Sequence, residues 1–257
     1  MSLPDPEPIA PELLLVDISN SRTKIAGATP AALTDQRVTL PTAELGADSL
    51  KDIPWARSAR WIVLASVVPE KTKVLEEVFG ERLLQVSHEI ELGVAIDYPE
   101  PETIGADRLA NAAAVAALHG APGVVVDFGT AVTFDIISGE GAYVGGVIAP
   151  GLEVMTDYMF QRTALLPKID LLEPTEIIGK STKSAMMAGA VHGYRGMIKE
   201  ILTEIYAEFG NSGNAHARTI ATGGYAGLIS EKIDQIDAVD PEFTLQGLRI
   251  IAGLNGV

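Results

Sequence analysis

The stretch Glu12-Leu-Leu-Leu-Val-Asp-Ile-Ser-Asn-Ser-Arg-Thr-Lys24 decides the expected fold, because its pattern returns in Val124-Val-Val-Asp-Phe-Gly-Thr-Ala-Val-Thr133. In both stretches an apolar run, which predicts a buried strand, ends in Asp and is followed by a short turn. A polar residue stands at position +3 from each Asp, and Thr stands at +6. Two unrelated hairpins would also explain so short a match, but a duplicated domain explains it better.

The rest of the chain gives each half the same order of elements. In the first half we expect strands and then helices, at 12–18, 22–28, 36–41, 60–68, 71–79 and 107–119. In the second half we expect strands at 124–128, 131–137, 143–148 and 218–222, and helices at 182–209, 225–231 and 245–254. This alternation predicts an α/β fold with two domains, 12–120 and 121–257, after a loose, acidic, proline-rich tail at 1–11.

Composition excludes several classes of function. The formal charge of −15 argues against nucleic acid as a partner, because phosphate neutralisation needs clustered Lys and Arg. No apolar run approaches the roughly 20 residues of a membrane-spanning helix, so no membrane partner is expected. The chain has no cysteine, which excludes disulfides, thiolate zinc sites and a cysteine nucleophile. With no secretory signal at the start, a cytoplasmic location is expected.

The first candidate site is the corner that follows Asp17. A carboxylate at the end of a buried strand, next to the free N–H groups of a tight turn, suits Mg²⁺ and phosphate oxygens. Asn20 and Lys24 add a donor and a positive charge for phosphate. A turn-capping Asp beside a surface Lys is an equally good explanation of this motif taken alone.

The second candidate site is the matching corner at Asp127. Thr130 and Thr133 follow this Asp, and Gly129 lets a phosphate approach the backbone closely. If the two Asp corners face each other, they form a nucleotide cleft. The sequence contains neither a Walker-type Gly-x-x-x-x-Gly-Lys nor a Gly-x-Ser-x-Gly elbow, so the commonest rival phosphate and hydrolase sites are excluded.

A third candidate site lies at the start of the helix that Gly105-Ala-Asp-Arg108 opens. Asp107 there is either a helix cap or a base that accepts the proton of a substrate hydroxyl during phosphoryl transfer. Arg108 beside it suits an anionic part of the same substrate. Tyr98 and Pro101 precede this segment and either wall a pocket or simply pack.

Taken together, these motifs resemble those of the type III pantothenate kinases. The resemblance rests on Asp17–Lys24, Tyr98-x-x-Pro101, Gly105–Arg108, Asp127-Phe-Gly-Thr130, Tyr143-x-Gly-Gly146 with Pro150-Gly151, Thr182 and Thr222-Gly-Gly224. That family belongs to the superfamily of acetate kinase, sugar kinases, Hsp70 and actin. The resemblance therefore implies duplicated ribonuclease H-like (actin-like ATPase) domains with a nucleotide cleft between them.

The resemblance also implies an activity and a set of site residues. The reaction would be ATP-dependent phosphorylation of pantothenate to 4′-phosphopantothenate, the first step of coenzyme A biosynthesis, by a cytoplasmic homodimer. Asp107 would be the catalytic base. ATP would bind Asp17, Ile18, Ser19, Asn20, Ser21, Arg22, Thr23, Lys24 and Thr130. Pantothenate would contact Tyr98, Gly105, Ala106, Asp107, Arg108 and Thr182. Asp127 would hold a monovalent cation (K⁺ or NH₄⁺), and Asp17 would hold Mg²⁺ through phosphate or water.

Two features keep other interpretations open. Ser19 and Ser21 stand where the family usually has Gly and Thr, and Ser19 adds a side chain and a restriction on φ. A non-catalytic regulatory paralogue, or a kinase of the same fold acting on another small hydroxyl or acyl substrate, is the alternative. For the homodimer, the helix at 182–209 is expected to contribute to the contact, because its Ala, Met and Gly positions allow close helix packing.

Overall fold

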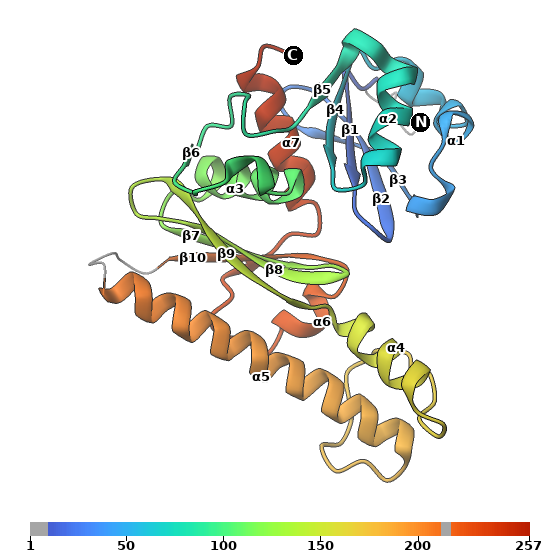
Figure 1. The fold of residues 1–257 in the computed structure, drawn as a ribbon, viewed down its shortest axis with the longest axis vertical. Helices are drawn as coiled ribbons and strands as arrows, with labels where there is room; N and C mark the ends of the chain where they lie inside the picture. Colours follow the sequence, from blue (N-terminus) through green and yellow to red (C-terminus); the bar gives the residue numbers. More distant parts are fainter. Residues whose placement is uncertain (1–9, 212–216) are drawn as a thin grey trace, which may run out of the picture. The chain divides into compact units, whose positions relative to one another are not determined.

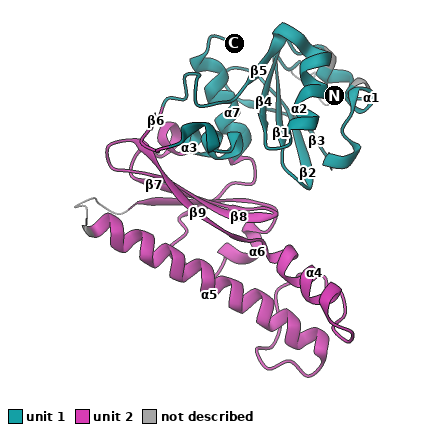
Figure 2. Cartoon of the chain, in the orientation of Figure 1, with its two compact units in different colours: residues 1–93, 100–114, 244–257 teal, residues 94–99, 115–243 magenta. Residues whose placement is uncertain are grey.

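The computed structural model describes residues 10–211 and 217–257, so the tail expected at 1–11 lies almost wholly outside it. The chain divides into two compact units (Figure 2). Unit 1 comprises the residues up to 93 together with 100–114 and 244–257, and unit 2 comprises 94–99 and 115–243. Each unit is built on its own β-sheet (Figure 1).

The sheet of unit 1 has the strand order β3-β2-β1-β4-β5. Its strands are β1 (Leu13–Ile18), β2 (Arg22–Ala28), β3 (Leu33–Pro41), β4 (Trp61–Ser66) and β5 (Leu83–Gln85). β1 runs antiparallel to β2 and parallel to β4. β1 and β4 lie side by side inside the sheet, and both are almost entirely buried, as their predominantly apolar sequences predict.

Helices cover both faces of this sheet. Alternate residues of β1 pack with α1 (Ala47–Lys51), η2 (Pro54–Arg57) and α2 (Pro69–Phe79) on one side. On the other side lie α7 (Phe243–Leu254) and the first part of α3 (Ala106–Leu118) (Figure 1). Besides η2, the 3₁₀ turns within the described residues are η1 (Thr42–Glu44), η3 (Gly80–Arg82) and η4 (Pro101–Thr103).

The C-terminal helix belongs to unit 1, which differs from the expected division at residue 120. A Cβ on Gly247 would lie 2.0 Å from the carbonyl oxygen of Ala110, so α7 crosses α3 at a distance that only glycine permits. The buried hydroxyl of Thr244 donates to Asn111 Oδ1 at 2.9 Å. Residues 94–99, expected in the first domain, belong to unit 2, because β6 (Ala95–Ile96) pairs with β9 (Ala142–Pro150) of that unit. Such long-range packing leaves no local trace in the sequence.

The sheet of unit 2 has the order β11-β10-β7-β8-β9-β6. Its other strands are β7 (Gly123–Phe128), β8 (Ala131–Ile137), β9 (Ala142–Pro150), β10 (Arg218–Gly223) and β11 (Ala238–Val239). β7 is antiparallel to β8 and parallel to β10, as β1 is to β2 and β4. The series β9-β8-β7-β10-β11 therefore reproduces β3-β2-β1-β4-β5, and the predicted duplication is confirmed.

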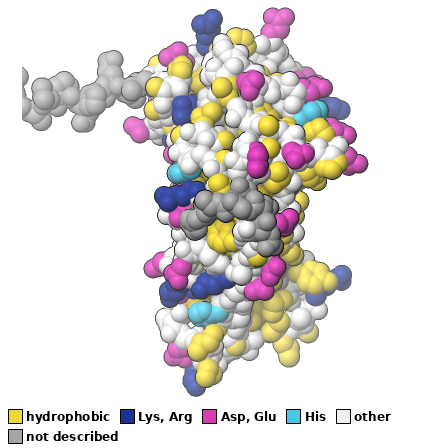
Figure 3. All heavy atoms as spheres, turned by 90° about the vertical axis from the view of Figure 1, so that its left-hand side faces the viewer, with side chains coloured by type: hydrophobic (Ala, Val, Ile, Leu, Met, Phe, Trp, Pro, Cys, Tyr) yellow, Lys and Arg dark blue, Asp and Glu magenta, His cyan; other side chains and the backbone are white. Residues whose placement is uncertain are grey.

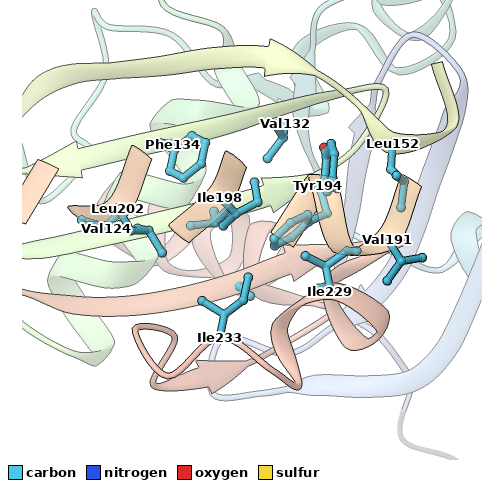
Figure 4. Packing of buried hydrophobic residues seen from close by; sticks show 14 of the residues in the cluster. Val124, Val132, Phe134, Leu152, Val191, Tyr194, Ile198, Leu202, Ile229 and Ile233 are labelled. Atoms are coloured by element: carbon cyan, nitrogen blue, oxygen red, sulfur yellow. The ribbon is translucent and has the colours of Figure 1, made fainter. Parts of the chain in front are cut away.

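One face of the second sheet is covered by α5 (Thr182–Asn211) and α6 (Ala226–Ser230) (Figures 1 and 4). Figure 4 shows Val191, Tyr194, Ile198 and Leu202 of α5 packing with Val124 and other residues of the strands. A further helix, α4 (Leu152–Arg162), was not expected from the sequence. Of its residues only Leu152 and Thr156 are buried, and its other large apolar side chains, Val154, Met155, Tyr158, Met159 and Phe160, are exposed.

Charged side chains of both signs lie on the surface (Figure 3). Figure 3 shows acidic and basic side chains interspersed on the face that it draws, rather than a broad basic surface. Within residues 10–211 and 217–257, no helix combines the length and the apolar character that crossing a membrane would need.

Candidate active site

The Asp17 corner lies at the end of β1. Asp17 is only 4% exposed and stands opposite Lys24 on β2 and Ala65 on β4. Because directly paired residues of adjacent strands project from the same face of a sheet, the carboxylate and the Lys24 side chain leave the sheet on the same side. The structure thus places the predicted carboxylate of Asp17 and the predicted positive charge of Lys24 on the same face of the sheet. Asn20, Ser21 and Arg22 are exposed in the turn that follows.

The turn after Asp17 is braced by a residue that the sequence did not single out. The Ser19 N–H donates to the Arg22 carbonyl at 3.1 Å. Thr42, in η1, donates its N–H to the Ser21 carbonyl at 3.0 Å and its hydroxyl to the Ser19 carbonyl at 2.7 Å. Every positive φ among residues 10–211 and 217–257 belongs to a glycine, so Ser19 occupies ordinary backbone geometry and does not need to be glycine.

Asp107 sits in the first turn of α3. The carbonyl of Gly105, the residue before α3, accepts the N–H of Leu109 at 3.1 Å and so makes the first hydrogen bond of the helix. Asp107 Oδ1 accepts the N–H of Arg108 at 2.9 Å, which fixes the carboxylate on the helix end. A Cβ on Gly105 would lie 2.6 Å from that oxygen and 3.4 Å from Val67 Cγ1. Glycine at 105 therefore leaves the space that the carboxylate occupies.

The surroundings of Asp107 alter its acidity. Burial raises the pKa of the Asp107 carboxyl above its ordinary value, while the N–H and the positive charge of Arg108 oppose that rise. A carboxylate that only caps a helix is normally solvated and more acidic. A half-buried carboxylate with a raised pKa is a stronger base, which suits proton acceptance.

The Asp127 corner repeats the first one in unit 2. Asp127 is half-buried at the end of β7 and stands opposite Thr133 on β8 and Thr222 on β10. The Thr222 hydroxyl is fully buried and has no hydrogen-bond partner within the part of the chain that the structure describes. A Cβ on Gly223, whose φ is +92°, would lie 2.5 Å from Asp127 Oδ1. The corner thus combines a carboxylate and a buried hydroxyl on one face, with a glycine packed close to the carboxylate.

The turn that carries Thr130 is packed against the end of β9. The Gly151 N–H donates to the Thr130 carbonyl at 3.0 Å. A Cβ on Gly151 would lie 2.2 Å from that oxygen and 2.5 Å from the Gly129 carbonyl, so only glycine fits. α4 begins directly after Gly151, and its N-terminal end therefore lies beside the exposed Thr130.

Tyr98 belongs to unit 2 through the pairing of β6 with β9. Its ring meets the ring of Tyr143 edge-on, with 6.2 Å between centroids, and its exposed fraction is 37%. Gly145, with φ +121°, lies under this ring: a Cβ there would be 3.4 Å from Tyr98 Cε2. Gly145 thus lies in contact with the Tyr98 ring.

Thr182 is exposed at the start of α5. Its neighbours Ser181 and Ser184 form reciprocal hydrogen bonds of 3.0 and 3.1 Å that cap the helix. A cavity of about 380 Å³ lies beside this turn, lined by Leu172, Glu173, Pro174, Thr175, Glu176, Lys180, Ser181, Lys183, Ser184 and Met187. None of the residues expected to bind ATP lines it.

The predicted residues therefore form separate groups within the two units. Asp17 with Lys24, Gly105 with Asp107 and Arg108, and Asp127 with Thr222 are each brought together. Thr42 and Asp135 were missed. Asp135 is fully buried on β8, on the same face of the sheet as Asp127. An acidic residue within an otherwise apolar strand was the sequence feature that could have indicated it.

Comparisons with known proteins identify the family of the chain. A family model for type III pantothenate kinase matches residues 13–204. The type III pantothenate kinase of Akkermansia muciniphila is 49% identical over 242 residues, which cover 94% of this chain and 98% of that protein. That of Methylacidiphilum infernorum is 43% identical over 239 residues, or 93% and 87% of the two chains.

Solved structures support the fold alone. A Campylobacter jejuni protein described as a Baf family transcriptional activator has a TM-score of 0.58 at 21% identity, over 93% of this chain and 97% of that chain. A Porphyromonas gingivalis protein described as an N-acetylglucosamine kinase has a TM-score of 0.50 at 14% identity, over 95% and 100%. The duplicated sheets are therefore those of the actin-like ATPase and sugar kinase fold.

Proposed function

This chain belongs to the type III pantothenate kinases, and from that membership we propose which of its residues carry out the reaction. The enzyme phosphorylates pantothenate with ATP and a divalent metal ion. One observation above all supports the assignment of residues: the half-buried Asp107 is held at a helix start that glycine keeps open for its carboxylate.

Asp107 is the catalytic base of this proposal. Its carboxylate accepts the proton of the pantothenate 4′-hydroxyl as that oxygen bonds to the γ-phosphorus of ATP and the bond to ADP breaks. Arg108 pairs with the carboxylate at the far end of pantothenate. Gly105 and Ala106 give the substrate access to backbone, while Tyr98 and Thr182 make the remaining contacts.

The loop from Asp17 to Lys24 and the turn at Thr130 bind ATP. Lys24 offers a positive charge on the side of the sheet that carries Asp17, and the start of α4 beside Thr130 offers N–H groups to phosphate. Among residues 10–211 and 217–257, no three His, Asp or Glu side chains are placed so that they could hold a metal ion by themselves. In this proposal Asp17, at the end of β1, holds Mg²⁺ through phosphate or water. Mg²⁺, when bound, neutralises charge on the transferring phosphoryl group.

Asp127 holds a monovalent cation, K⁺ or NH₄⁺. The fit to such an ion rests on a half-buried carboxylate, on the buried hydroxyl of Thr222 beside it, and on Gly223, which keeps the carboxylate unobstructed. Oxygen donors of this kind suit hard cations. The bound ion would lower the negative potential that phosphate oxygens meet at this corner.

The enzyme works as a cytoplasmic homodimer in this proposal. Gly189, Gly193 and Gly196 are exposed on α5, and a Cβ on any of them would meet only open space. Such small residues allow a second helix to approach closely. Large apolar side chains are also exposed on α4 and the segment that follows it, namely Val154, Met155, Tyr158, Met159, Phe160, Leu165, Leu172, Ile177 and Ile178.

A substrate screen tests the activity of the purified protein. Incubation with ATP, Mg²⁺ and K⁺ should convert pantothenate to 4′-phosphopantothenate, detected by mass, and should leave acetate and N-acetyl sugars unchanged. Replacing K⁺ by Na⁺ should lower the rate if Asp127 holds the monovalent ion. Absence of turnover with pantothenate at high K⁺ would contradict the proposal.

A further inference from the structure

Thr42 lies outside every motif of the family resemblance and yet makes three hydrogen bonds to the loop that follows Asp17. We propose that Thr42 is a positioning residue that holds the turn Ser19–Arg22 in the shape that binds the phosphates of ATP. The inference rests on the proposed role of that loop in ATP binding.

The turn needs support because of its backbone geometry. β1 and β2 are joined through a tight turn whose central residues are Asn20 and Ser21, closed by the Ser19 N–H on the Arg22 carbonyl at 3.1 Å. Two-residue hairpin loops favour turns with positive φ, since their twist matches that of the strands. Neither Asn20 nor Ser21 has a positive φ, because every described residue that has one is a glycine. The turn is therefore not of the favoured type.

Thr42 supplies the missing support. It is 3% exposed and arrives from η1, directly after β3. Its N–H donates to the Ser21 carbonyl at 3.0 Å and its hydroxyl to the Ser19 carbonyl at 2.7 Å. The Thr23 hydroxyl lies 3.0 Å from the Thr42 hydroxyl. Because the single proton of Thr42 Oγ1 is used on Ser19, Thr23 is the donor in that pair.

These bonds also decide where a donor of the turn points. The Ser19–Asn20 peptide is trans, since the cis peptide of the described chain is Ala121–Pro122. In a trans peptide the C=O and the N–H point in opposite directions. The Ser19 carbonyl faces Thr42, so the Asn20 N–H faces away from it, on the exposed side of the turn. A backbone N–H presented in this way is what a phosphate oxygen binds.

Thr42 further explains how this chain tolerates Ser19 and Ser21. A flexible glycine loop can adjust to phosphate, whereas two serines in ordinary backbone geometry must already be near the binding shape. Both of their carbonyls are held by the same residue, which fixes the turn before ATP arrives. Preorganisation of this kind raises affinity by lowering the ordering cost.

The test compares Thr42→Val, which removes the hydroxyl, with Thr42→Ser, which keeps it. Thr34→Val is the matched control, because Thr34 is also a buried threonine of unit 1 and its hydroxyl has no hydrogen-bond partner among the described residues. We expect Thr42→Val to weaken binding of a non-hydrolysable ATP analogue, measured by calorimetry, by about tenfold. Its KM for pantothenate should change less than twofold. Thr42→Ser and Thr34→Val should bind the analogue like the wild type.

Hydrogen exchange separates the possible failures. In the apo protein, Thr42→Val should speed exchange in a peptide covering 18–23 while circular dichroism stays unchanged. Faster exchange with unaltered analogue affinity would overturn the positioning role and leave the kinase assignment standing. Equal losses in Thr42→Val and Thr34→Val would reduce the role to general stability and also overturn it. If the wild type phosphorylates pantothenate and no substitution in this turn alters the affinity for the ATP analogue, the assignment of the turn as a phosphate-binding loop would itself be refuted.

Discussion

Gly105 and Asp107 are matched to each other: a Cβ at 105 would lie 2.6 Å from Asp107 Oδ1, closer than any real contact of this kind. The same oxygen accepts the Arg108 N–H at 2.9 Å. The carboxylate therefore has one position at the start of α3, and the glycine before it keeps that position open.

Replacing Gly105 by alanine should move the Asp107 carboxylate without unfolding the protein. Because misplacement of a catalytic group by about 1 Å costs up to about a hundredfold in rate, we expect kcat to fall by about ten- to a hundredfold. Gly46→Ala is the control, since Gly46 also precedes a helix but a Cβ there meets nothing within 4 Å. Steady-state kinetics that show equal effects of the two substitutions would contradict this account.

Gly223→Ala should weaken the monovalent cation site. The new Cβ would lie 2.5 Å from Asp127 Oδ1, and the positive φ of +92° adds backbone strain. We expect the concentration of K⁺ that gives half-maximal activity to rise by about tenfold, with a matching loss of Tl⁺ binding measured by ²⁰⁵Tl NMR. Gly224→Ala, where a Cβ meets nothing within 4 Å, should leave both values unchanged. A Gly223→Ala protein with normal Tl⁺ affinity would argue against the site.

The Arg195–Glu173 pair should stabilise unit 2 over most of the pH range. Arg195 is 4% exposed and bonds both oxygens of Glu173, at 3.1 and 2.6 Å. These hydrogen bonds, with one from Lys232, lower the pKa of Glu173 from 4.5 to about 2. A lowered carboxyl pKa contributes stability that is present above pH 4.5 and lost as the pH falls towards 2.

Glu173→Gln should therefore lower the unfolding free energy by about 1–2 kcal/mol at pH 7, because it leaves the buried guanidinium without its charge partner while water screens the exposed side. The difference from wild type should shrink as the pH falls below 4.5 towards 2 in thermal melts. Lys232→Ala, which removes a 56% exposed side chain, should cost much less. Equal losses from the two substitutions would assign the stability to surface charge instead.

Gly193→Arg should separate the proposed dimer. The position lies in the middle of the exposed glycine series on α5, and a long charged side chain there would prevent close approach of a second helix. Sedimentation should show a dimer for wild type and a monomer for the variant. Lys199→Glu, also exposed on α5, is the control and should stay dimeric. A wild-type monomer at micromolar concentration would contradict the assembly.

The sequence predicted the parts of the fold that depend on local pattern. The apolar runs that end in Asp17 and Asp127 predicted both hairpins, and the repetition of the turn after each Asp predicted the duplicated domain. Pairing register corrects one detail: Asp17 stands opposite Lys24, whereas Asp127 stands opposite Thr133. Thr23, which matches Thr133 in spacing, therefore projects from the other face of its sheet and bonds Thr42 instead.

The features that sequence reasoning missed depend on contacts between distant segments. Thr42 braces a turn about 20 residues earlier, and nothing near Thr42 in the chain indicates that role. The packing of Gly247 on Ala110 places the C-terminal helix in unit 1. The glycines at 105 and 223 were visible as motif residues, but only the structure shows that the carboxylates of Asp107 and Asp127 occupy the space beside them.

The assignment of Asp107 as the base is tested most directly by Asp107→Asn, which keeps the shape and removes proton acceptance. We expect kcat with pantothenate to fall at least about a hundredfold while the affinity for an ATP analogue changes less than about twofold. In the wild type, kcat/KM should be lost as the pH falls through the pKa of Asp107, which burial raises above the ordinary 3.8. An Asn variant that turns over pantothenate at the wild-type rate, with the same pH profile, would contradict the account.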